Sequence, residues 1–123
     1  MEELIKSSKD MLGCLKAEYE NLQVAFKAET DVQKMDDLDT KISQIGKAIV
    51  ELEIKVLSLE VAAKKSTFDP SRLGPLAKSM SDHCQETSRV IKEYSDSIDQ
   101  AKYLASRVES GAKLVGNILK TIA

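Results

Sequence analysis

The feature that most constrains how this 123-residue chain folds is a repeat of apolar residues at alternating spacings of three and four. This spacing places the apolar side chains along one seam of an α-helix, as in coiled coils. The repeat occurs in three segments, which predict helices over residues of about 3–28, 35–65 and 75–122. We therefore expect an all-α protein.

The C-terminal segment carries the longest repeat. One heptad position is occupied by Ala77, Cys84, Ile91, Ile98, Ala105, Ala112 and Leu119, and the position three residues later by Met80, Thr87, Tyr94, Ala101, Val108, Val115 and Ile122. The alternation has no interruption, so we predict one continuous helix, roughly 70 Å long at a rise of ~1.5 Å per residue.

The middle segment has the largest apolar residues on its seam: Met35, Leu38, Ile42, Ile45, Ile49, Leu52, Val56, Leu59 and Ala63. Aspartates near its start and lysines at its end match the helix dipole. The N-terminal segment repeats the pattern with Ile5, Ser8, Leu12, Leu15, Tyr19, Leu22 and Phe26.

The junction between the first two segments allows two interpretations. Phe26 and Met35 are nine positions apart, and nine steps of ~100° place the two seams on opposite sides of a straight helix. Either the helix breaks near Thr30–Asp31, where Thr30 and Gln33 could form a capping box, or one long helix presents two faces to two neighbours. The change of phase favours the break.

Both prolines lie in the stretch 66–75, the one clear interruption. Asp69 followed by Pro70 predicts a helix N-cap, and Gly74–Pro75 indicates that a longer helix begins at Pro75. Aromatic residues make up only 4% of the chain, which favours long helices side by side over a compact globular core. We predict one coiled-coil domain over 1–123 with a loop at 66–74. It would form an elongated antiparallel hairpin or a three-helix bundle, with oligomers as an option.

Charge and hydropathy exclude several classes of function. The net charge is −2 and the pI is about 5.5, so we expect no binding to nucleic acid. No apolar run is long enough for a transmembrane helix, and the first residues do not resemble a signal peptide. These absent signals predict a cytoplasmic location.

Catalytic and metal-binding residues are also scarce. His83 is the single histidine, and the seams carry no carboxylate that could join it around a metal ion. We expect His83 to be a partly exposed flanking residue, and we expect no enzyme activity, cofactor or metal. Cys14 falls at an outer heptad position and Cys84 at an inner one, so both are predicted to stay reduced.

The last predicted helix is longer than the middle helix with which it would pair, so its tail needs another partner. We predict partner-binding residues on this tail: Val108, Val115, Ile118, Leu119 and Ile122. The expected function is a non-enzymatic protein–protein interaction or scaffolding subunit. Its seams would pack against helices of a partner or of a second copy. The alternative is a membrane-surface protein that uses the amphipathic stretch 111–123, although its two lysines would attract anionic lipid only weakly.

Overall fold

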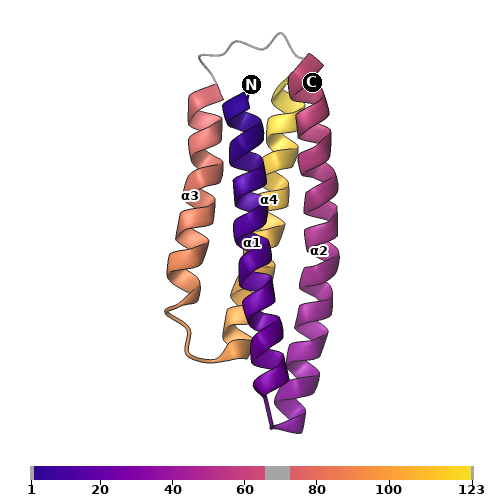
Figure 1. Ribbon diagram of the computed structural model, residues 1–123, viewed down its shortest axis with the longest axis vertical. Helices are drawn as coiled ribbons and strands as arrows, with labels where there is room; N and C mark the ends of the chain where they lie inside the picture. The colour runs from indigo at the N-terminus through magenta and orange to yellow at the C-terminus, as the bar shows by residue number, and fades with distance from the viewer. Residues whose placement is uncertain (1, 66–72, 123) are drawn as a thin grey trace.

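The computed structural model describes residues 2–65 and 73–122, which form four helices. They are α1 (Glu2–Ala28), α2 (Val32–Lys65), α3 (Leu73–Ile91) and α4 (Ser97–Ile122). The helices lie side by side in an elongated bundle (Figure 1). The all-α prediction is confirmed, whereas the hairpin and three-helix alternatives are not, because the described chain contains four helices.

The arrangement of the helices leaves α2 and α3 on opposite sides of the bundle. α1 lies in front and α4 behind, and each of them contacts the other three helices (Figure 1). Within the described residues α2 and α3 do not touch each other. The chain runs up and down, so α1 is parallel to α3 and α2 is parallel to α4 (Figure 1). Because α3 is out of reach, α2 packs against α1 and α4 only, and its opposite side is left uncovered by the described helices.

The predicted continuous helix over 75–122 is wrong, because the chain turns at residues 92–96. Asp96 caps the new helix: its side-chain oxygen accepts a hydrogen bond from the amide of Ile98 at 2.7 Å. The Gln100 side chain donates to the carbonyl of Tyr94 at 2.8 Å, which satisfies part of the turn. Folding back buries an apolar seam that a single long helix would leave without an intrachain partner.

The predicted break between the first two segments is confirmed, since α1 ends at Ala28 and α2 begins at Val32. The cap, however, is not Thr30. A carboxylate oxygen of Asp31 accepts hydrogen bonds from the amides of Gln33 at 2.9 Å and Lys34 at 3.2 Å. Aspartate at this position satisfies two of the amides that a helix start leaves free.

The core follows the predicted seams in part. α2 buries all but Met35 of its predicted seam, and α1 buries Ser8, Leu15 and Leu22 while its other seam residues are half-buried. In α4 the core face is rotated from the prediction and consists of Ala101, Leu104, Val108, Gly111, Val115, Ile118 and Ile122. α3 begins at Leu73, two positions before the predicted Pro75, and the proposed cap at Asp69 lies outside the described residues.

The prediction for the cysteines is wrong. Cys14 lies on the side of α1 that faces α3, where it is paired with Cys84 in a disulfide, with a Cα–Cα distance of 6.0 Å. The heptad count placed Cys14 outside because it assumed one buried seam per helix. α1 packs against three neighbours, so its buried surface is wider than a single seam.

Candidate interaction surface

The structure buries the residues that were predicted to bind a partner. Val108, Val115, Ile118 and Ile122 belong to the core, and Leu119 is half-buried beside it. They lie on α4, which packs closely along α2. The reason for assigning them, a tail seam without an intrachain partner, is therefore wrong. The same core residues make up much of the apolar face on which the membrane alternative depended.

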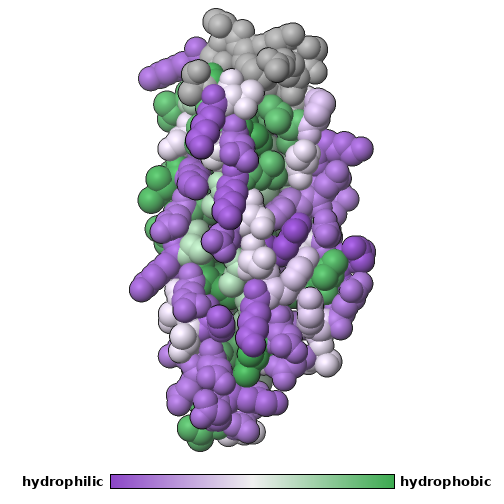
Figure 2. Space-filling model, turned by 180° about the vertical axis from the view of Figure 1, so that it is seen from behind, coloured by the Kyte–Doolittle hydropathy of each residue, from purple (hydrophilic) through white to green (hydrophobic). Residues whose placement is uncertain are grey.

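A different apolar surface lies on the outer face of α2. Val50, Ile54, Leu57 and Val61 are 54%, 59%, 59% and 54% exposed. Their spacing of four, three and four is that of a coiled-coil seam. We call these four residues the α2 stripe. In Figure 2 hydrophobic side chains line the left margin of the molecule, where the upper half of α2 lies when it is seen from behind.

The α2 stripe lies opposite the helix's own core seam, so α2 is apolar on two faces. Three of its residues, with Ser58 and Ala62, line a shallow groove. The sequence contains the signal, since the four residues form a heptad pattern of their own. That pattern was overlooked because the stronger seam on the same helix already accounted for its burial.

Acidic residues in ion pairs lie along one edge of the α2 stripe. Along the edge toward α1, Glu53 pairs with Lys16 and Glu60 pairs with Lys9, the latter at 3.1 Å. The hydrogen bond from Lys9 lowers the pKa of Glu60, while its partial burial acts in the opposite direction. Glu60 is also 3.4 Å from Lys64 of α2, so both carboxylates have lysine partners within the chain.

Lysines stand at both ends of the α2 stripe. Lys47 precedes Ile54 by seven positions, and Lys65 follows Val61 by four, so both project from the same face as the stripe. Both are exposed, and among the described residues neither has an ion pair. The surface therefore consists of a narrow apolar line with an exposed lysine at each end.

A polar cluster lies inside the bundle, between α3 and α4. His83 is buried, not partly exposed as predicted, and its Nε2 donates to the carbonyl of Arg107 at 2.8 Å. Arg107 in turn donates to the Thr87 hydroxyl at 2.9 Å. Burial lowers the pKa of His83, although the hydrogen bond to the carbonyl raises it. The groups satisfy one another, and no cluster suited to a metal ion occurs in residues 2–65 and 73–122.

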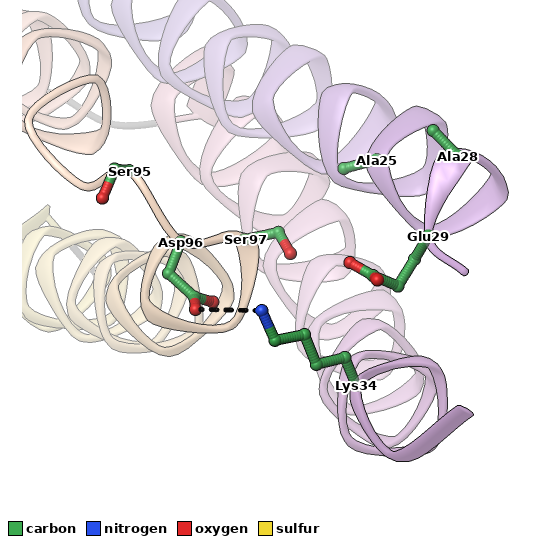
Figure 3. A pocket seen from close by; sticks show the side chains of 7 residues that line it. All are labelled: Ala25, Ala28, Glu29, Lys34, Ser95, Asp96 and Ser97. Carbon is green, nitrogen blue, oxygen red and sulfur yellow. Dashed lines mark ion pairs between the residues drawn. The ribbon is translucent and has the colours of Figure 1, made fainter. Parts of the chain in front are cut away.

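A second depression lies where the two lower turns meet (Figure 3). Lys34 reaches from the first turn of α2 toward Asp96 at the start of α4, with the ammonium and carboxylate 3.8 Å apart. Asp96 is also the cap of α4, and Glu29 accepts hydrogen bonds from the amides of its own turn. The ion pair between Lys34 and Asp96 connects the two turns, and Ser95 and Ser97 line the depression beside it.

Comparisons with protein-family models, with curated proteins and with solved structures found no match. The function of the chain must therefore be inferred from its own surfaces.

Proposed function

We propose that this chain is a non-enzymatic protein-interaction module that docks one α-helix of another molecule along the α2 stripe. The observation that carries the proposal is the exposed 4-3-4 line of Val50, Ile54, Leu57 and Val61. Large aliphatic side chains that gather on one exposed face are typical of sites that bind another protein. An amphipathic helix with the complementary spacing would pack its own apolar residues between them.

The size of the α2 stripe indicates a moderate affinity. Completing the burial of each side chain would contribute roughly 1–2 kcal/mol, at about 25 cal/mol per Å² of apolar surface. Part of that gain is offset by the loss of translational and rotational freedom on association. The chain would thus act as a module that binds reversibly, and it would not require a partner in order to fold.

The membrane-surface alternative requires an exposed apolar face over the stretch 111–123. Among the described helices none is long and apolar enough to cross a membrane. Of the large apolar residues in the stretch 111–122, Val115, Ile118 and Ile122 are buried, and Leu114 and Leu119 are half-buried.

Photo-cross-linking in the native cell tests the proposal. A photo-reactive benzoylphenylalanine at Leu57 should give discrete cross-linked products that the same group at Val24, a 66% exposed valine on α1, does not give. With the captured protein in purified form, Ile54→Glu should weaken binding by at least about tenfold, because it places a charge in an apolar contact. Val24→Glu should leave affinity unchanged, and both variants should melt like the wild type.

Identical products from both positions, or none from Leu57, would contradict the docking function. An unchanged affinity in Ile54→Glu would show that the captured protein binds elsewhere.

A further inference from the structure

We infer that the helix that binds the α2 stripe belongs to a different protein and carries carboxylates at both ends of its apolar residues. This inference rests on the proposed function and specifies the chemistry of the partner. It follows from the lysines that bound the stripe and from the way in which a second copy would meet them.

The two lysines mark the length of the site. Lys47 and Lys65 are 18 positions apart on one face, which is about 27 Å along the helix. A docked helix that covers the stripe would bring its own residues close to both ammonium groups. Partly desolvated lysines need an opposite charge, so Glu or Asp side chains at these two places are the fitting partners.

A second copy would place like charges together. In an antiparallel pair, the register that matches Val50 with the second copy's Val61, and Ile54 with its Leu57, brings Lys47 opposite the second copy's Lys64. This lysine is the neighbour of Lys65, and its ammonium group is 3.4 Å from its own Glu60. A parallel pair would set Lys47 against the second copy's Lys47 at one end and Lys64 against Lys64 at the other. Like charges across a seam oppose pairing.

The area of the α2 stripe also argues against a homodimer. Four side chains with just over half of their surface exposed offer only a few hundred Å², close to the largest apolar patch of an ordinary monomer. A stable interface buries roughly 800 Å² per partner. A single helix of a different protein needs no larger surface, because its other face stays in solvent or in its own fold.

Three glutamates of α2 lie beside the stripe. Glu53 and Glu60 are paired with α1, so they do not repel an acidic partner strongly. Glu51, on the opposite edge, is exposed and has no ion pair among the described residues. It lies beside Val50 and one turn after Lys47, so it favours a basic residue one turn inside that acidic end of the docked helix.

Two designed peptides of about 20 residues test the inference, since that length spans the site as a helix. Both carry four leucines at the 4-3-4 spacing, and they differ only in having Glu or Lys at the two end positions. Fluorescence anisotropy should show at least about tenfold tighter binding of the Glu-ended peptide, a difference that high salt reduces. The double variant Lys47→Glu, Lys65→Glu should reverse the preference.

Other results of these measurements would contradict either the docking function or the proposed chemistry of the partner. Equal affinity for both peptides, lost in Ile54→Glu, would keep the docking function and overturn the acidic partner. Binding of neither peptide at millimolar concentration would overturn both. A dimer in sedimentation velocity that Ile54→Glu dissociates would identify the occupant as a second copy and overturn the inference of a different protein.

Discussion

His83 shows how one residue can be placed by packing that the local sequence does not reveal. A heptad count puts it on the flank of its helix, yet α4 covers it, and its Nε2 is 2.8 Å from the Arg107 carbonyl. Gly111 of α4 lies beside it: a Cβ at that position would be in van der Waals contact with the same nitrogen, at 3.4 Å. Only the pairing of two helices distant in sequence brings these groups together.

The buried position predicts a pH dependence of stability. Burial lowers the pKa of His83 from its ordinary 6.5, so the unfolded chain takes up a proton at a higher pH than the folded chain. The contribution of His83 to the free energy of unfolding is thus complete above that ordinary value and is lost as the pH falls below it. Urea denaturation between pH 8 and pH 5.5 should show this decrease, and His83→Gln should remove it. An equal decrease in the variant would mean that another group is responsible.

At the scale of the helix, the sequence predicted faces better than ends. The core face of α2 and the break before it could be read from periodicity and phase. The turn at 92–96 could not, because the 3-4 alternation continues across it from Ile91 to Ile98. A heptad pattern does not distinguish one long helix from two helices that fold back, since apolar residues at this spacing can continue through a turn. The cluster Ser95–Asp96–Ser97 was the available signal, as all three residues favour helix N-caps.

The cap gives a test at this scale. Asp96→Ala should lower the free energy of unfolding by about 1 kcal/mol, because it leaves the amide of Ile98 without its acceptor. Asp96→Asn retains an acceptor and should stay close to the wild type in urea denaturation. The exposed ion pair with Lys34 is expected to contribute little. If the asparagine variant loses as much stability as the alanine variant, the charge and not the cap is what matters.

The outer face of α2 was missed for a related reason. Its stripe is apolar enough to be noticed, but a sequence does not reveal which of two apolar faces the rest of the chain will cover. That choice depends on α1 and α4 lying on the same side of α2, with α3 out of reach. The candidate interaction site is thus a consequence of topology, and its residues could be recognised only after the neighbours of α2 were known.

For the whole molecule, the sequence likewise does not reveal which helices pack against each other. The sequence indicates long amphipathic helices with few aromatic residues, and the bundle has both properties. It does not specify that α1 and α4 contact each other across the middle while α2 and α3 stay apart. Once the C-terminal segment folds back, four helices supply enough apolar surface to bury every predicted tail residue at least partly.

The disulfide acts at this scale, because it joins the parallel helices α1 and α3 across 70 positions of sequence. α3 has no contact with α2 in the described structure, so α1, α4 and this bond hold it in place. A loop of this length should stabilise the oxidised chain by about 4 kcal/mol on the chain-entropy model. We expect dithiothreitol to lower the urea midpoint of the wild type to that of Cys14→Ser, which should not respond to the reductant.

The mass of the unreduced protein checks the premise of that prediction, since the oxidised chain should be lighter by two hydrogens. A full-length mass with both thiols free, after purification in air, would contradict the pairing of Cys14 with Cys84. The cytoplasmic location expected from the sequence stays a prediction, and a reducing cytosol would keep the pair open. In that case α3 would depend on its packing against α1 and α4 alone, and the reduced midpoint would measure the stability that matters in the cell.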